Sequence, residues 1–210
     1  MRRRSLACAL AVPAAAAGLA AGAAFAAPAA HAQTANTDTD TGGTVAITVP
    51  ESYIAQLAKA GVVEFPVPAS ELSVDHSSKT VTVTFTVTGG DADISVFSGS
   101  LDLSGTVDVA GVRHPHPVTL GSLQLDVFNG QLDATPAGSS TPVPLLDVAG
   151  NTSFTVTPGA TSAADTYSSD EMTVDPAGAA YLNSALGTSA FQAGQNVGTM
   201  SASWTVTNPS

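Results

Sequence analysis

Alternation of apolar and polar residues dominates the middle of the chain. From Lys79 to Thr88, valine or phenylalanine occupies every second position, and threonine occupies the positions between them. Successive side chains of a strand point to opposite faces, so this pattern predicts a half-buried strand with a threonine-rich outer face. The segments 101–109 and 198–206 repeat the pattern, the second of them with Met200 and Trp204 on its apolar face.

Further short apolar segments, separated by clusters of glycine, proline and asparagine, predict more strands. These segments are 44–49, 62–67, 93–98, 118–128, 143–148, 152–157 and 170–174. In 118–128 the apolar positions change parity at Gly121-Ser122, which predicts a β-bulge. Many short strands of this kind predict a mostly β fold, either an antiparallel β-sandwich or a barrel-like arrangement of sheets.

Two segments depart from this alternation and predict short helices, so the expected class is α+β. In residues 51–61, Tyr53 and the aliphatic side chains recur at helical spacing before a glycine. The second helix is expected to begin after Asp175, which suits an N-cap, with Pro176 in the first helical position. Gly187 favours its end.

The N-terminal residues 1–32 have the pattern of an export signal. Arg2, Arg3 and Arg4 precede an alanine-rich apolar stretch, and Ala30-His31-Ala32 suits cleavage after Ala32. A retained membrane anchor is the alternative, which the prolines and glycines in the stretch disfavour. Residues 33–43 predict a flexible lead-in rather than a calcium loop, and residues 44–207 a single β-rich domain. The sequence therefore predicts a secreted or cell-surface protein.

Charge and cysteine content restrict the partners further. Removal of residues 1–32 leaves three basic against seventeen acidic residues, a net charge of −14. Such an acidic protein repels phosphate backbones, which excludes nucleic acid as an expected partner. The only cysteine, Cys8, lies within the export signal, so we expect no disulfide and no thiol chemistry in the mature chain. We also expect no membrane-spanning segment after the signal.

Sequence motifs of known catalytic sites are missing, and we expect a protein that is not an enzyme. There is no G-x-S-x-G, no H-E-x-x-H and no phosphate-binding glycine motif. Asp91 and Asp93 have the same strand parity, but beside Gly89-Gly90 they favour a turn with solvated acids over a hydrolase dyad.

Two other places carry candidate ligands. His114 and His116 would point the same way in an extended segment and could bind a metal, but the prolines beside them favour an exposed loop. Tyr53 suits a core residue, an interface residue or an iron ligand. Composition alone favours packing in the core.

Three short motifs resemble the HtaA family of actinobacterial secreted and surface haem-uptake domains. They are Glu51-Ser52-Tyr53-Ile54, the segment 98–103 and the segment 174–200, and the similarity extends over about residues 43–206. The resemblance implies a mostly β domain with two helices that holds haem through a tyrosine supported by a histidine. Tyr53 matches that tyrosine, so the resemblance implies Tyr53 as the haem-iron ligand. The implied partners are haem or haem-carrying proteins and other envelope proteins.

The chain departs from the family pattern at three positions. The family histidine falls near Phe97, a second tyrosine is replaced by Gln192, and the tryptophan of the first strand is replaced within Val45-Ala46-Ile47. We therefore expect a divergent, non-enzymatic haem-binding or haem-relay domain in which haem binding is retained, altered or lost. The alternative is a structural or adhesive β-sandwich protein of the cell envelope.

Overall fold

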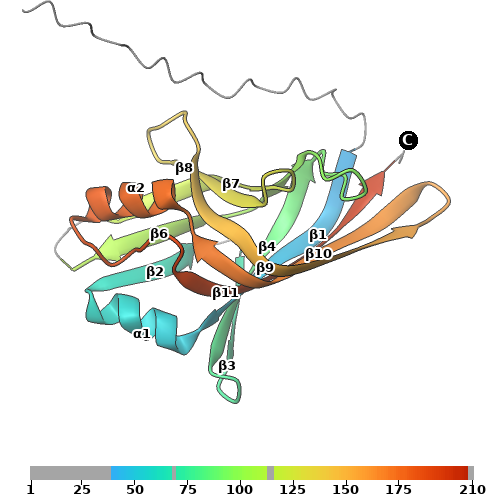
Figure 1. Cartoon of the computed structure of the whole chain (residues 1–210). Helices are drawn as coiled ribbons and strands as arrows, with labels where there is room; N and C mark the ends of the chain where they lie inside the picture. The colour runs from blue at the N-terminus through green and yellow to red at the C-terminus, as the bar shows by residue number, and fades with distance from the viewer. Residues whose placement is uncertain (1–38, 68–69, 113–115, 208–210) are drawn as a thin grey trace, which may run out of the picture. The chain divides into compact units, whose positions relative to one another are not determined.

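Strands make up most of the domain, and they pair antiparallel in one sheet. The computed structural model describes residues 39–67, 70–112 and 116–207 (Figure 1). Its elements are β1 (Thr39–Pro50), α1 (Glu51–Lys59), β2 (Val62–Val67), β3 (Ser70–Asp75), β4 (Thr80–Gly90), β5 (Ser100–Leu103), β6 (Thr106–Gly111), β7 (Val118–Asp126), β8 (Gln131–Pro136), β9 (Val143–Pro158), β10 (Ser162–Val174), α2 (Pro176–Leu186) and β11 (Asn196–Thr207).

Eight of these strands close into a barrel. Their order is β7-β5-β4-β1-β11-β10-β9-β8, and β8 pairs back with β7, with Leu132 opposite Leu125. The prediction of a mostly antiparallel β fold with two short helices is therefore confirmed. Of the two architectures that the alternation allowed, the chain adopts the barrel.

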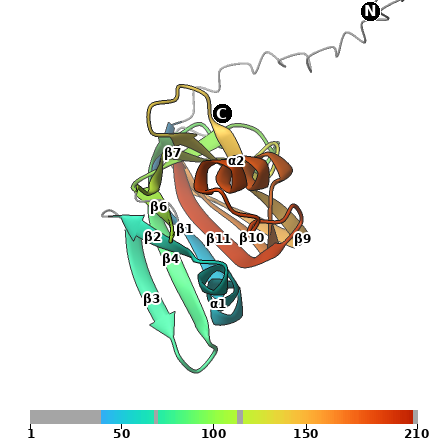
Figure 2. The ribbon, with the colours of Figure 1, turned by 90° about the vertical axis from the view of Figure 1, so that its left-hand side faces the viewer.

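The barrel wall divides at one end because β4 and β7 each pair with two different strands along one edge. β4 pairs with β3 through Phe85 and with β5 from Val87 onward. β7 pairs with β6 through Leu120 and with β5 from Leu123 onward. β2 adds to β6, so the wall ends in two arms, β3–β4 and β2–β6. Helix α1 follows β1 and packs against β2 near these arms (Figure 2).

Apolar side chains of the alternating strands fill the interior, as their spacing predicts. The buried set includes Val45, Ile47, Phe85, Val87, Leu101, Leu103, Leu123, Leu125, Trp204 and Val206. Helix α2 packs against β9 and buries Leu182 and Leu186. Its predicted ends are confirmed: Asp175 Oδ1 accepts hydrogen bonds from the backbone N–H groups of Ala177 and Gly178 at 2.6 and 3.3 Å, and Gly187 closes the helix at φ 59°.

The prediction of a strand over 93–98 is wrong. These residues form a turn, closed by an isolated bridge between Asp93 and Ser98, and Phe97 has φ 49°. Asp93 Oδ1 accepts hydrogen bonds from both the backbone N–H and the hydroxyl of Ser95. Such local hydrogen bonds compete with a strand ladder, which explains why the apolar pattern does not form one here.

Several boundaries also differ from the prediction. β3 and β8 were not predicted, and the two segments 143–148 and 152–157 form one continuous strand, β9. β1 begins at Thr39, so the last five residues assigned to the lead-in 33–43 belong to the barrel. The export signal 1–32 lies outside the described residues. The bulge at Gly121-Ser122 is confirmed, because the β7–β8 register shifts there and Ser122 has φ 45°.

Candidate functional site

An apolar cavity of about 380 Å³ lies between α1, the divided barrel wall and α2. Its lining comes from both helices and most of the strands. Among the described residues, it consists of aliphatic and phenylalanine side chains with two exceptions. Those exceptions are Tyr53 from α1 and Glu64 from β2. Small-molecule sites have this character, an apolar wall with a few polar groups that orient the ligand.

The cavity opens to solvent beside α1 and the two arms. Four of its aliphatic lining residues are exposed: Ile54 at 40%, Val63 at 41%, Leu72 at 56% and Val74 at 46%. Exposed apolar side chains that gather around a hollow mark a binding surface more often than chance exposure does. The rim therefore offers a hydrophobic entrance to the cavity.

Tyr53 lies on the wall of this cavity and is itself 6% exposed. Its position follows from helical spacing, because Tyr53 and Leu57 share the buried face of α1. No hydrogen bond of the Tyr53 hydroxyl is found within the described residues. Burial and then the nearby Glu64 carboxylate raise the pKa of Tyr53 above its usual range, so the free protein holds it as a neutral phenol.

Glu64 is the second polar group, and it was not singled out from the sequence. It is exposed by area, but it borders the apolar cavity rather than bulk water alone. Loss of hydration there raises the pKa of the Glu64 carboxyl from its ordinary value of 4.5 to about 7. Near neutral pH a part of the Glu64 population is therefore protonated.

We expect Glu64→Gln to remove part of the pH dependence of stability. The folded carboxyl holds its proton more tightly than the unfolded one, so wild-type stability should fall as pH rises from about 4.5 to about 7. The fall from this group should be about 1–2 kcal/mol, since solvent reduces the effect at an accessible side chain. Urea unfolding of both proteins at pH 5 and pH 8 measures it. Equal pH dependence in the two proteins would contradict the assignment.

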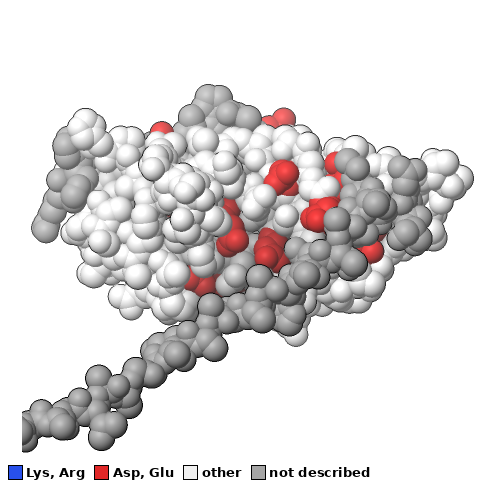
Figure 3. All heavy atoms as spheres, turned by 90° about the horizontal axis from the view of Figure 1, so that it is seen from above, with Lys and Arg blue, Asp and Glu red and all other residues white. Residues whose placement is uncertain are grey.

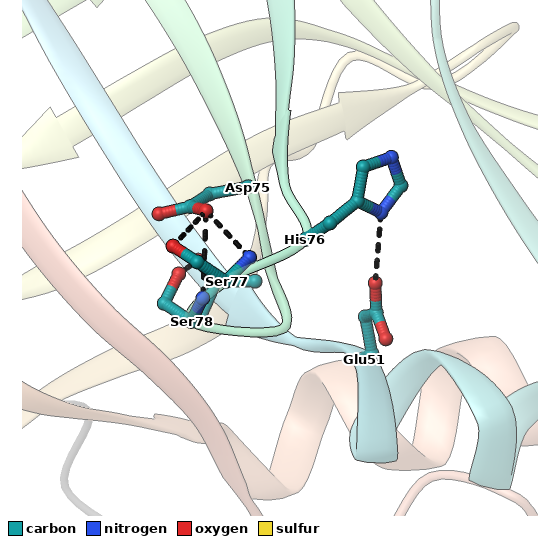
Figure 4. Close-up of polar contacts among 6 residues, drawn as sticks. Glu51, Asp75, His76, Ser77 and Ser78 are labelled. Carbon is teal, nitrogen blue, oxygen red and sulfur yellow. Dashed lines mark hydrogen bonds and ion pairs between the residues drawn. The ribbon is translucent and has the colours of Figure 1, made fainter.

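The β3–β4 turn lies next to the start of α1 and holds one rim of the cavity in place. Asp75 Oδ1 accepts hydrogen bonds from Ser77 and Ser78, which lower the pKa of Asp75 to about 2 (Figure 4). The Glu51 backbone N–H donates to the Lys79 carbonyl at 2.9 Å. His76 Nδ1 lies 4.0 Å from Glu51 Oε1, an exposed pair that contributes little energy. The backbone hydrogen bond from Glu51 to Lys79 therefore connects the turn to α1 more firmly than the exposed His76–Glu51 pair does.

The chemical character of the lining is compatible with haem, the group implied by the HtaA resemblance. The walls are apolar, and a phenol at the wall can serve ferric iron as a phenolate, because a bound cation favours loss of the proton. Lys59 lines a neighbouring hollow of about 650 Å³ that shares Ala58 and Val62 with the cavity, so a cation lies close to the entrance for an acidic ligand group. Among the described residues, no histidine lines the cavity.

The structure separates the other predicted residues from Tyr53. Phe97, near the position of the family histidine, does not line the cavity and packs edge to face on Phe154 with ring centroids 5.0 Å apart. Gln192 is exposed, whereas its neighbour Phe191 is buried in the cavity wall. His116 is exposed, and His114 lies outside the described residues.

Asp91 and Asp93 belong to a turn, as the sequence favoured. Asp91 Oδ1 accepts the Ser100 backbone N–H at 3.0 Å, and Asp93 accepts from Ser95. Both carboxylates are thus occupied in holding the chain between β4 and β5. They do not line the apolar cavity.

Acidic side chains gather on one face, seen from above in Figure 3. Four acidic residues that are far apart in the sequence lie close enough to interact: Asp126, Asp133, Asp147 and Asp175. Burial, and then repulsion from the other three carboxylates, raises the pKa of Asp133. The Gln131 side-chain amide donates to Asp147 at 3.0 Å. Among the described residues, no group of three or more His, Cys, Asp or Glu side chains is placed to hold a metal ion.

Comparison with known proteins identifies a shared fold. No protein-family model matches the sequence, and no curated protein matches it. The fold is similar to the crystal structure of the C-terminal domain of HtaA from Corynebacterium glutamicum, with a TM-score of 0.53 and 14% sequence identity. The match covers 81% of this chain and 99% of that chain. None of the described helices is long and apolar enough to cross a membrane.

Proposed function

We propose that this chain is a secreted or cell-surface haem-binding or haem-relay domain that is not an enzyme, with haem in the apolar cavity. The observation that supports the proposal is the lining of that cavity, where Tyr53 and Glu64 are the polar side chains among the described residues. Tyr53 is buried among core side chains, and it also borders a hollow whose aliphatic rim is exposed. Fold likeness to the HtaA domain is compatible with this proposal but does not by itself assign a ligand.

In this proposal Tyr53 is the iron ligand. A phenolate is a hard anionic ligand suited to ferric iron, which haem carries outside the cell. Bound haem would supply the positive charge that compensates the loss of the phenol proton. Glu64 would lie beside the ligand in place of the family histidine, and a neighbouring carboxylate commonly sets the protonation and orientation of a ligand. The partners would be haem-carrying or other envelope proteins.

A haemin titration of residues 33–210, followed by Soret absorbance, tests the proposal. We expect saturable binding by the wild type and at least about tenfold weaker binding by Tyr53→Phe, which keeps the ring but removes the ligand oxygen. The tyrosinate-to-iron charge-transfer band should be absent in the variant. Tyr181→Phe is the matched control, because Tyr181 lies on α2 outside the cavity lining, and it should bind as the wild type does.

Two results would refute haem carriage through Tyr53. The first is the absence of saturable haemin binding by the wild type. The second is binding with the same affinity and spectrum in Tyr53→Phe. The second result removes Tyr53 as the ligand. The first favours the alternative function, a structural or adhesive protein of the cell envelope, which the exposed and uncharged outer part of β9 supports independently.

A further inference from the structure

The outer part of β9 is an open strand edge. β8 pairs with β9 only over Val143–Asp147, whereas β10 accompanies β9 to Pro158. From Ala149 to Pro158, no strand of the described residues pairs with the other edge of β9. Figure 1 shows the β9–β10 hairpin reaching away from the two helices. Its backbone therefore presents unpaired N–H and C=O groups to solvent.

Beyond the register shift at Gly150, this edge lacks the charged and proline residues that usually keep strand edges apart. Residues 151–157, NTSFTVT, contain no charged residue and no proline, and every one of them is exposed. Edge strands of monomeric proteins are commonly protected by lysine, proline, bulges or inward charges. In a chain with seventeen acidic residues, a neutral stretch of this length is where two identical copies can meet without charge repulsion.

Next to this open edge, one face of the β9–β10 hairpin carries exposed apolar side chains. Phe154 and Val156 are 51% and 38% exposed, and both point to the face that carries Tyr167 and Asp165, their partners on β10. The Phe154 ring packs against Phe97, which is itself 37% exposed. The edge thus combines unpaired backbone with an exposed aromatic cluster.

We propose that β9 is a self-association surface, where a second copy of this chain adds its own β9 antiparallel to the first. A two-fold axis at Thr155 gives a self-complementary register in which Thr155 faces its own counterpart. Phe154 then lies opposite Val156 of the second copy, and the reverse pair forms as well. Aromatic and β-branched residues are favourable cross-strand partners, and the two contacts are identical by symmetry. No residue from Ala149 to Pro158 lines the apolar cavity, so the proposal is independent of haem binding.

Sedimentation velocity of residues 33–210, between about 1 µM and about 1 mM, tests the proposal. We expect the wild type to pass from monomer towards dimer as its concentration rises. Thr155→Lys places two like charges opposite each other at the axis, and it should raise the dimer dissociation constant at least about tenfold. Thr141→Lys is the matched control, because Thr141 is also an exposed threonine and lies just before β9; this variant should dimerise as the wild type does.

Hydrogen exchange distinguishes this interface from any other. Amides of 151–157 should gain protection with concentration in the wild type and in Thr141→Lys, but not in Thr155→Lys. A wild type that stays monomeric throughout overturns the proposal and leaves the edge to a strand from a different protein. Dimers that form equally well in Thr155→Lys overturn it too, because they use another surface. A thermal unfolding curve equal to that of the wild type confirms that Thr155→Lys folds.

Discussion

Replacing Trp204 by alanine is expected to lower the free energy of unfolding by about 3–5 kcal/mol, as for other buried tryptophans. Trp204 is 2% exposed and lies on β11, which β1 and β10 flank in the barrel. Its indole N–H also donates to the Ala92 carbonyl at 3.3 Å. The substitution therefore opens a large cavity in the core and leaves a buried carbonyl without its donor.

Urea unfolding at pH 7 measures this loss, with Trp204→Phe and Phe128→Ala as comparisons. Trp204→Phe should cost less than the alanine change, because it keeps most of the apolar volume and removes the donor. Phe128 is 60% exposed, so Phe128→Ala should change stability by less than about 1 kcal/mol. A cost below about 1.5 kcal/mol for Trp204→Ala would show that the barrel interior repacks around the missing ring.

Much of the barrel could be predicted because many strands carry their own pattern. The alternation from Lys79 to Thr88 reports the inner and outer faces of β4 directly, and the caps at Asp175 and Gly187 mark α2. Each signal is local, since period and capping depend on neighbouring residues only. The pairing of β7 with β8 that closes the barrel is not local. The sequence therefore did not decide between a sandwich and a barrel.

The failures also have local causes. β8 reads QLDATP, where an aspartate and a proline disfavour a strand, yet pairing with both β7 and β9 stabilises it. The segment 93–98 has strand-like apolar residues, yet hydrogen bonds from Ser95 to Asp93 hold it as a turn. Tertiary pairing prevails over propensity in the first case, and side-chain hydrogen bonding prevails over pattern in the second.

The two polar residues of the cavity differ in how much the sequence says about them. Helical spacing places Tyr53 on the apolar face of α1, which by itself favours packing in the core, and only the HtaA resemblance implies it as a ligand. Glu64 gives no such signal, since an acid in a two-faced strand normally points to water. Its place at the cavity depends on the division of the barrel wall into two arms, which brings β2 beside α1. No local pattern encodes that arrangement.

Gly178→Ala is expected to destabilise the domain by about 1–3 kcal/mol, although alanine normally stabilises a helix relative to glycine by about 1 kcal/mol. The reason is the close approach of α2 to β9: a Cβ at Gly178 would lie 2.7 Å from the Pro144 carbonyl oxygen and 2.8 Å from the Leu145 Cα. These neighbours are backbone atoms, so the helix must move away from the strand. Such a shift would carry Leu182, which lines the cavity, away from β9.

Ser184→Ala, at an exposed position of the same helix, separates the two effects. It should raise stability by a few tenths of a kcal/mol, roughly the difference in helix propensity. Thermal unfolding of the three proteins should therefore give opposite signs for two substitutions that both improve helix propensity. Stabilisation by Gly178→Ala would mean that α2 does not rest on the β9 backbone. In that case the cavity wall formed by α2 would be free to adjust, and binding of a large apolar ligand would not depend on a fixed distance between helix and strand.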